Sequence, residues 1–465
     1  MQSLTFSSLN LHSALVDNLS TLGYQQMTAI QAQSLPAIIN NQDVIAQAKT
    51  GSGKTAAFAL GLLNKLDVKR FRVQSLVLCP TRELADQVAK EIRKLARAIH
   101  NIKVLTLCGG TPMGPQIGSL EHGAHIIVGT PGRIEDHLRK KRLSLDNLTT
   151  LVLDEADRML EMGFQDALDL IFSLAPTQRQ TLLFSATFPA QIEKLADKFM
   201  REPIKITAQE NHDNNSINQH FYHVENNSER LLATRLLLQQ YQPHSCVIFC
   251  NTKAECQDVA DQLYQQGYSV LALHGDLEQK DRDQTLVRFA NKSIAILVAT
   301  DVAARGLDID NLDMVINYHI AHDPEVHLHR IGRTGRAGAT GVALSLISHK
   351  EAHKVIRLEE YLAQNIVSEH LPSNDVLSKP IIKPTMVTLQ IDGGKKQKLR
   401  PTDILGALTA TNSRTESIQG GQVGKIQLFS TRAYVAVERK VANIALKKIA
   451  EGKMKGRNFR VRKLN

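Results

Sequence analysis

The sequence predicts an α/β protein that contains two parallel-sheet domains in tandem and a small C-terminal α+β domain. Short apolar runs alternate with helical patterns through the first two thirds of the chain, as expected of βα repeats around parallel sheets. Two stretches that are polar or rich in proline interrupt this alternation, and we expect them to separate domains. The segment after the second interruption is much more basic than the rest.

The composition is that of a soluble globular protein, because 43% of the residues are hydrophobic and 22% are charged. No apolar run approaches the roughly eighteen residues of a membrane span, and the N-terminus lacks the pattern of a secretory signal. The five cysteines are scattered, which predicts free thiols and a cytoplasmic protein. A metal site at Cys246, Cys250 and Cys256 is the alternative, but their spacing fits no common zinc pattern.

The charge is concentrated at one end of the chain, whose net charge is +10. From Lys379 onward there are 19 basic and 5 acidic residues, whereas the preceding part has 37 basic and 41 acidic residues. This asymmetry predicts a nucleic-acid partner for the last segment. A solvated basic surface without a partner is the alternative.

The alternation defines the domains and their strands. The first domain spans residues 1–207, with strands predicted at residues 43–48, 75–80, 103–108, 125–130, 151–156 and 181–186. After a polar linker at residues 208–218, the second domain spans residues 219–365, with strands at residues 246–251, 269–275, 295–300, 314–320 and 342–347. A proline-containing linker at residues 366–384 precedes the last domain, residues 385–465.

The stretch AKTGSGKT, which begins at Ala48, lies between a predicted strand and a predicted helix. Gly51 and Gly53 allow the backbone to curl so that its N–H groups face an anion, and the helix N-terminus adds partial positive charge. Lys54 would reach the β- and γ-phosphates of a nucleotide, and Thr55 would bind Mg²⁺. Ala48 replaces the first glycine of the general pattern. The sequence therefore predicts a phosphate-binding loop rather than an ordinary turn.

A second motif supplies the acidic groups that such a loop requires. Asp154 ends the apolar strand in LVLDEADRM, where it can hold Mg²⁺ through water. Glu155 beside it could polarise the water that attacks the nucleotide. A charged loop without catalytic function is the alternative.

These motifs resemble those of the DEAD-box RNA helicases, which have two RecA-like domains and use ATP and Mg²⁺. The other motifs of that family follow in the same order, and they are PTREL from Pro80, GG at Gly109 and Gly110, TPGR from Thr130, and SAT from Ser185. An adenine-reading motif is similar to GYQQMTAIQ from Gly23, where Met27 and Ala29 replace the usual prolines. Gln31 would pair with the adenine edge and Phe6 would stack on its ring, although a core position for Phe6 is the alternative.

The resemblance implies a role for each matching position of the first domain. Ser185 and Thr187 would couple the nucleotide state to RNA binding. The ATP site would comprise Phe6, Tyr24, Gln31, Ala48, Lys49, Thr50, Gly51, Ser52, Gly53, Lys54 and Thr55. The RNA backbone would be contacted by Pro80, Thr81, Arg82, Gly110, Thr130, Pro131, Gly132 and Arg133.

The second domain has no phosphate-binding loop, but it contains HRIGRTGR from His329. Arg330, Arg333 and Arg336 recur every three residues, and arginines left unpaired at a domain edge are suited to bind phosphate. Surface salt bridges are the alternative. The resemblance makes His329, Arg333 and Arg336 catalytic, with the last two reaching the γ-phosphate.

The resemblance also implies how the two domains work together. ATP bound between them would close a cleft, and the closed state would bend one RNA strand so that short duplexes open. Hydrolysis would reopen the cleft. Asp308 would contact the ribose of ATP, and the RNA contacts of this domain would come from Arg282, Thr300, Asp301 and Gly306.

The last domain shows the order β-α-β-β-α-β, which resembles an RNA-recognition motif. Alternation along its strands points Val435, Val437, Phe459 and Val461 toward the helices. The opposite face is then open and cationic. Candidate RNA-binding residues of this domain, from that face and from the loops, are Lys395, Lys396, Lys398, Arg400, Lys425, Arg432, Tyr434, Lys455, Arg460 and Arg462. A basic domain that binds any RNA is the alternative.

The whole chain resembles the bacterial DbpA subgroup of these helicases, on the residues HGDLEQKDRDQTLVRFAN, IDGGKKQKLRP and VRKLN. That resemblance implies a monomeric helicase directed by its C-terminal domain to 23S rRNA during assembly of the large (50S) ribosomal subunit. A general RNA chaperone or clamp without rRNA specificity, and a DNA translocase of related fold, are the alternatives.

Overall fold

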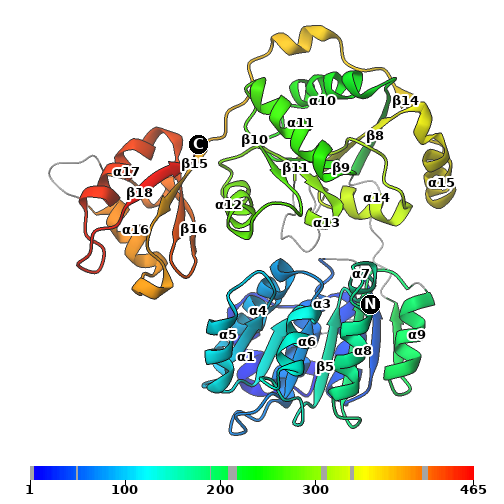
Figure 1. Ribbon diagram of the computed structural model, residues 1–465, viewed down its shortest axis with the longest axis vertical. Coiled ribbons are helices and arrows are strands. Elements are labelled where there is room, and N and C mark those ends of the chain that lie inside the picture. Colours follow the sequence, from blue (N-terminus) through cyan, green and yellow to red (C-terminus); the bar gives the residue numbers. More distant parts are fainter. Residues whose placement is uncertain are drawn as a thin grey trace. The chain divides into compact units, whose positions relative to one another are not determined.

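The computed structural model describes residues 5–48, 51–188, 190–207, 217–304, 312–335, 340–410 and 417–464. The chain divides into two compact units, and the second unit contains both the second parallel-sheet domain and the C-terminal domain. The predicted fold class is confirmed for each domain (Figure 1). Five predicted site residues lie outside the described residues, namely Lys49, Thr50, Gly306, Asp308 and Arg336.

The first domain is a parallel sheet with helices on both faces, ordered β3-β4-β2-β5-β6-β1-β7 among the described residues. Its strands are β1 Val44–Gln47, β2 Ser75–Leu78, β3 Val104–Leu107, β4 Ile126–Gly129, β5 Thr150–Asp154, β6 Gln180–Ser185 and β7 Ile204–Thr207. Its α-helices are α1 Ser13–Thr21, α2 Ala29–Ile39, α3 Lys54–Lys65, α4 Arg82–Leu95, α5 Met113–Glu121, α6 Pro131–Arg139, α7 Ala156–Glu161, α8 Gln165–Leu174 and α9 Ala190–Phe199.

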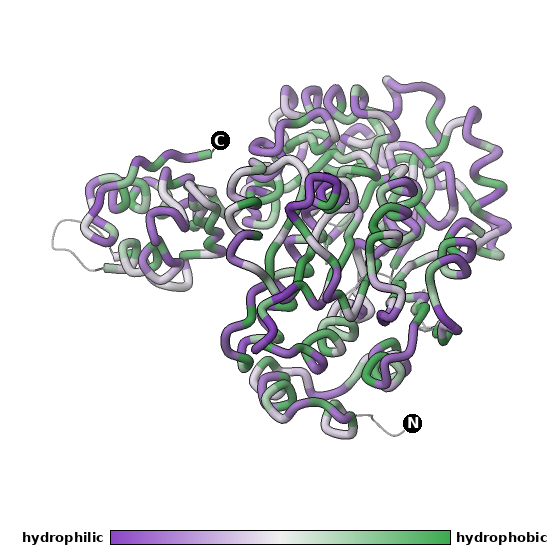
Figure 2. The backbone as a smooth tube through the Cα atoms, turned by 60° about the horizontal axis from the view of Figure 1, so that its bottom comes forward, coloured by the Kyte–Doolittle hydropathy of each residue, from purple (hydrophilic) through white to green (hydrophobic). Residues whose placement is uncertain are grey.

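Both faces of this sheet are apolar because successive strand residues point to opposite sides. Ala46 and Phe184 belong to one core cluster, and their neighbours Ile45 and Leu183 belong to the other. Figure 2 shows hydrophobic stretches running through the interior, whereas the outer helical coils carry hydrophilic and hydrophobic residues together. The predicted central strands are confirmed, whereas β7 lies in a stretch for which no strand was predicted.

The second domain repeats this architecture, with the strand order β10-β11-β9-β12-β13-β8-β14 among the described residues. Its strands are β8 Ile217–His223, β9 Cys246–Cys250, β10 Val270–Leu273, β11 Ile296–Thr300, β12 Met314–Asn317, β13 Gly341–Ile347 and β14 Ser368–Glu369. Its α-helices are α10 Asn227–Tyr241, α11 Lys253–Gln265, α12 Gln279–Ala290, α13 Asp301–Ala304, α14 Pro324–Ile331 and α15 Ala352–Leu362. All five cysteines of the chain are free, as predicted, and all of them are buried.

The C-terminal domain is an antiparallel sheet of order β16-β17-β15-β18 with two α-helices on one face (Figure 1). Its elements are β15 Met386–Ile391, α16 Pro401–Thr409, β16 Val423–Leu428, β17 Ala433–Glu438, α17 Ala442–Glu451 and β18 Val461–Leu464. Val435, Val437 and Phe459 pack in the core beneath the helices, as the alternation predicts.

The segment predicted as the second linker follows the surface of the second domain. Ser368–Glu369 forms the edge strand β14, and Asn374–Ser378 forms a 3₁₀-helix. Gln239 Nε2 donates to the Lys379 carbonyl at 3.0 Å. The first predicted linker lies outside the described residues except for its last two positions, where β8 begins.

Candidate functional site

The glycine-rich loop connects β1 to α3, which is the predicted setting of a phosphate-binding loop. Gly51 and Gly53 have φ values of 88° and 93°, a left-handed conformation that residues with a Cβ avoid. A Cβ at Gly53 would come within 2.5 Å of Gln31 Nε2. Gly53 is therefore required both by the backbone conformation and by the close approach of α2.

Two polar side chains hold this loop. Lys54 is buried at the start of α3, and its Nζ donates to the Ala48 carbonyl at 2.7 Å. Gln31 Nε2 donates to the Gly53 carbonyl at 3.1 Å, while its Oε1 accepts from the Thr28 backbone N–H at 2.9 Å. A bound phosphate would have to replace the Ala48 carbonyl as the partner of Lys54.

Of the two aromatic residues predicted for the adenine site, Phe6 belongs to the core and the partly buried Tyr24 packs against it. Phe6 is 3% exposed and lies edge-on to Tyr24, with 6.3 Å between the ring centroids. The Tyr24 hydroxyl donates to Glu91 at 2.6 Å. The core position that the sequence left open for Phe6 is therefore the one that this structure shows.

The acidic motif lies at the carboxyl end of β5. Burial raises the pKa of Asp154 to about 7, although the charge of Lys54 opposes this effect. A buried carboxyl that lacks a full counter-charge suits a divalent cation, and Thr55 at the start of α3 offers a hydroxyl oxygen. Glu155 Oε2 is 3.7 Å from Arg158 Nε. Among the described residues this oxygen accepts no hydrogen bond, so it can accept one from water.

Asp157 joins the acidic motif to the end of β6. Its Oδ2 accepts hydrogen bonds from the Thr187 hydroxyl at 2.8 Å and from the Thr187 backbone N–H at 3.0 Å. The Asp157 backbone N–H donates to Ser185 Oγ at 3.3 Å, and the Ala48 N–H donates to the Ser185 carbonyl at 3.1 Å. Although burial opposes ionisation, the bonds from Thr187 hold the pKa of Asp157 below its ordinary value. We call the Asp157–Thr187 contact the hook.

The loops expected to contact RNA follow β2, β3 and β4, which are adjacent in the sheet, whereas the nucleotide motifs follow β5, β6 and β1. Thr130 Oγ1 accepts from the Gly109 N–H at 3.3 Å, and Arg133 donates to the Thr111 carbonyl at 3.1 Å. Thr81 caps α4. The other candidates in these loops are Pro80, Arg82, Gly110, Pro131 and Gly132. The two sets of motifs thus occupy neighbouring halves of one sheet edge.

In the second domain, Arg330 is paired and 2% exposed, so the expectation of an unpaired arginine is wrong at this position. Its Nε and Nη2 donate to the two oxygens of Asp301 at 2.6 and 2.7 Å. It also donates to the His319 carbonyl at 2.7 Å and to Asn317 Oδ1 at 3.2 Å. Sequence spacing could not reveal this, because the partners come from β12 and from the segments after β11 and β12.

The remaining candidates of this domain lie near the carboxyl end of β11 and on α14. Thr300 ends β11, and Arg282 Nη2 donates to the Ala303 carbonyl at 2.8 Å. His329 is half-buried on α14, and Arg333 is 8% exposed just beyond that helix.

The second domain also contains a largely buried ion network formed by Arg230, Glu351, His319 and Glu255. Arg230 Nη2 donates to Glu351 Oε2 at 2.8 Å, and His319 lies 3.3 Å from Glu351 and 2.6 Å from Glu255. Although burial opposes its ionisation, the hydrogen bond from His319 and the charge of Arg230 lower the pKa of Glu351 to about 2. No sequence motif indicated this network, because its members are far apart in the chain.

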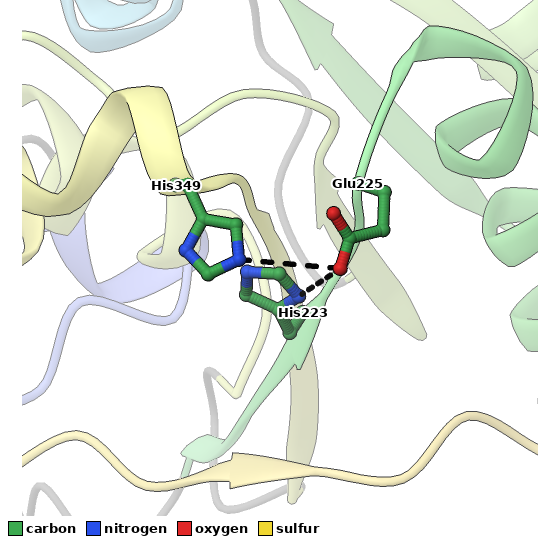
Figure 3. Close-up of side chains that lie close together, drawn as sticks. All are labelled: His223, Glu225 and His349. Carbon is green, nitrogen blue, oxygen red and sulfur yellow. Dashed lines mark ion pairs between the residues drawn. The ribbon is translucent and has the colours of Figure 1, made fainter.

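His223, Glu225 and His349 form the group of possible metal ligands that is found in the described part of the chain (Figure 3). Each imidazole lies 3.9 Å from Glu225 Oε1. Metal-binding histidines generally donate their second N–H to a partner, but His223 Nε2 is buried without one among the described residues. The group therefore resembles an exposed ion cluster more than a prepared metal centre.

The candidate RNA-binding residues of the C-terminal domain are not equally accessible. Tyr434 is 2% exposed, so the sheet face that the sequence predicts to be open is covered at this position. Arg432 is half-buried. The exposed candidates are Lys395, Lys396, Lys398, Arg400, Lys425, Lys455, Arg460 and Arg462.

Three known families match the chain. The DEAD/DEAH box helicase family matches residues 28–195, the helicase conserved C-terminal domain matches residues 227–338, and the DbpA RNA binding domain matches residues 388–463. Among the described residues, no helix is long and apolar enough to cross a membrane.

Individual relatives agree with these matches. The ATP-dependent RNA helicase DbpA of Escherichia coli (strain K12) is 53% identical over 460 residues, which cover 99% of each chain. The DEAD-box ATP-dependent RNA helicase CshA of Geobacillus kaustophilus (strain HTA426) is 44% identical over 76% of each chain. The structure of S. cerevisiae Dbp5 bound to RNA and ADP BeF3 matches with a TM-score of 0.72 at 31% identity, covering 80% of this chain and 96% of that one.

Proposed function

The chain belongs to the DbpA group of the DEAD-box ATP-dependent RNA helicases, and on this basis we propose that it opens short duplexes of 23S rRNA during assembly of the large ribosomal subunit. The C-terminal domain brings the helicase to that RNA. The protein acts as a monomer in the cytoplasm, where its buried free cysteines stay reduced.

The nucleotide site of the first domain binds and orients ATP. The left-handed glycines present the loop N–H groups to the phosphates, and Lys54 moves from the Ala48 carbonyl to the phosphate oxygens. Asp154 and the Thr55 hydroxyl would hold Mg²⁺, which would neutralise phosphate charge. Glu155 accepts a proton from the attacking water through the oxygen that accepts no other hydrogen bond among the described residues.

The hook is the observation that best supports a coupling between ATP binding and RNA binding. Ser185 contacts both the phosphate-binding loop and Asp157, while Asp157 holds Thr187. A shift of the acidic motif on ATP binding must therefore move the segment after β6. The loops that bind RNA lie at the same sheet edge. The shift therefore changes the affinity of these loops for RNA.

The rRNA target is supported by the match of residues 388–463 to the DbpA RNA binding domain and by the 53% identity to the E. coli protein over the full chain. The helicase domains grip a sugar-phosphate backbone and do not distinguish sequences. A separate domain with a strong positive charge is therefore the part of the chain that can select an RNA.

ATP hydrolysis with a panel of RNAs tests this function. A 23S rRNA fragment should stimulate the full chain more strongly than an unrelated RNA of equal length, and deletion of residues 385–465 should remove that preference while leaving weak general stimulation. Equal stimulation by all RNAs would favour the alternative function, a general RNA chaperone or clamp. Equal stimulation by DNA would exclude an RNA-specific helicase.

A further inference from the structure

The outer face of the C-terminal sheet, which points away from α16 and α17, is buried. Thr388 and Gln390 of β15 and Tyr434 and Ala436 of β17 lie on this face, and each is at most 2% exposed. Alternate residues of the same strands, such as Leu389, pack beneath the helices. A sheet with helices on one side alone leaves its other side in solvent, so another part of the chain must cover this face.

The segment after α12 of the second domain supplies this cover. Ser293 Oγ lies 2.7 Å from Thr388 Oγ1, and Asn291 Nδ2 donates to the same oxygen at 3.2 Å. Asn291 and Ser293 are themselves 3% and 7% exposed. Asp283 of α12 adds to the effect of burial in raising the pKa of Tyr434. Buried hydrogen bonds of this kind are lost if the two surfaces separate or slide.

The chain that leads into β15 is held on the second domain as well. Gln239 of α10 and Gln242, which directly follows that helix, donate to the carbonyls of Lys379 and Pro380 at 3.0 and 3.1 Å, and Ile381 packs against the core of the second domain. Only residues 382–385 separate Ile381 from the start of β15 at Met386, and each residue spans at most about 3.6 Å. The C-terminal domain therefore has little freedom to leave this position.

Most of the exposed cations in the described part of the domain lie in loops at one end of its sheet. The backbone N–H groups of Lys395 and Lys396 donate to the carbonyls of Phe429 and Ser430 at 2.9 and 2.8 Å, and the Asp392 N–H donates to the carbonyl of Arg460 at 2.8 Å. These bonds bring together the loops that follow β15, β16 and α17. We call this surface the cationic end. It contains the half-buried Arg432 and the exposed residues Lys395, Lys396, Lys398, Arg400, Lys453, Lys455, Arg457 and Arg460.

The acids of this surface are engaged locally. Asp403 accepts from the Arg400 N–H at 2.8 Å and lies 3.4 Å from Lys455 Nζ. Asp392 accepts from Gln390 Nε2 at 2.8 Å. Most of the cations are therefore not neutralised by these acids and can bind an external anion.

We propose that the outer face of the C-terminal sheet is an intramolecular docking surface for the second domain, and that RNA binds this domain through the phosphates that contact the cationic end. The second half of this proposal rests on the proposed function, because it identifies the surface that binds the RNA which that function requires. Bases stack on exposed rings, and Tyr434 offers none. Phosphates need accessible cations, which the cationic end provides without breaking the contact at Thr388.

A cross-link across the docking surface tests the first half of the proposal in the full chain. Two hydroxyl oxygens 2.7 Å apart place the Cβ atoms near the separation that a disulfide requires, so Ser293→Cys with Thr388→Cys should link on mild oxidation. All native cysteines are buried and should not compete. Ser293→Cys with Ser430→Cys is the matched control, because exposed Ser430 lies at the cationic end, and this pair should not link.

The cross-linked protein then reports whether RNA needs the outer face. We expect its affinity for a 23S rRNA fragment to stay within about twofold of the reduced form, because the phosphate contacts that determine affinity are elsewhere. Failure to cross-link, or loss of rRNA binding that reductant restores, would overturn the proposal.

Charge reversal tests the second half. Lys395→Glu with Lys396→Glu should weaken binding of the rRNA fragment by about tenfold or more and lower the salt dependence of binding. Lys440→Glu with Lys447→Glu, at two exposed positions outside the cationic end, is the control with the same charge change. Equal losses in the two pairs would refute the assignment. If the unmodified chain itself shows no preference for 23S rRNA, the proposed function fails instead, and the cross-linking result still tests the docking surface.

Discussion

Removing the hydroxyl of Thr187 is a direct test of the hook. Valine has the same shape but cannot donate a hydrogen bond, so Thr187→Val removes the 2.8 Å bond to Asp157 and leaves the 3.0 Å backbone bond in place. Asp157 is 4% exposed, and a hydrogen bond to a buried charged group contributes about 1.5–3 kcal/mol. For a domain of this size 1 kcal/mol corresponds to roughly 2–4 °C, so we expect the Tm of the first domain to fall by roughly 3–12 °C.

Circular dichroism melting of the full chain measures this shift, and ATP hydrolysis with and without RNA measures the coupling. Because the variant leaves the phosphate-binding loop intact, basal hydrolysis should persist while stimulation by RNA falls. Thr207→Val, at an exposed position at the end of β7, is the matched control and should change Tm by less than about 1 °C. An unchanged Tm together with full RNA stimulation in Thr187→Val would refute the role given to the hook.

Three further expectations concern other parts of the chain. Glu155→Gln should bind ATP but hydrolyse it far more slowly and so retain RNA in the presence of ATP, and rapid RNA release in a filter-binding assay would contradict this. Arg330→Met leaves Asp301 without its partner and should lower the free energy of unfolding of the second domain by about 3 kcal/mol, whereas a urea midpoint equal to that of the parent chain would disprove the structural role of this pair. The pKa of Glu351 is about 2 against an ordinary 4.5, so its ionised form stabilises the fold above that ordinary value and this contribution is lost as pH falls from 4.5 toward 2. Glu351→Gln should be less stable at neutral pH and lack that part of the acid dependence, and identical pH profiles would argue against the shift.

The nucleotide motifs could be placed from the sequence because their setting is local. A glycine-rich loop between a strand and a helix can fold in few ways, and Asp154 ends a strand whose apolar pattern is clear. In a parallel sheet all carboxyl ends meet at one edge, so motifs that are far apart in the chain were expected to converge. The structure confirms this convergence for the loops after β1, β5 and β6.

The parts that the sequence did not predict depend on partners that are remote in the chain. Alternation correctly separated Val435 from Tyr434 on the two faces of β17, but it could not show that Asn291 and Ser293, nearly a hundred positions before Thr388, cover the face that Thr388 and Tyr434 share. Whether Arg330 is paired or free likewise depends on Asp301, which forms an ion pair with it. In both cases the sequence pattern predicts the direction of a side chain, whereas the tertiary fold determines which residues contact it.

The contact between Thr388 and Ser293 bears on how this helicase could be re-engineered. Exchanging C-terminal domains between helicases treats the last domain as an independent module that can be joined at residue 385. Here the outer face of that module is covered by Asn291 and Ser293 of the segment after α12, and Asp283 of α12 acts on Tyr434 of the same face. A chimera that carries residues 385–465 alone would leave the buried polar face without its partners, so the exchange unit that preserves the domain should also include residues 279–293 of the donor.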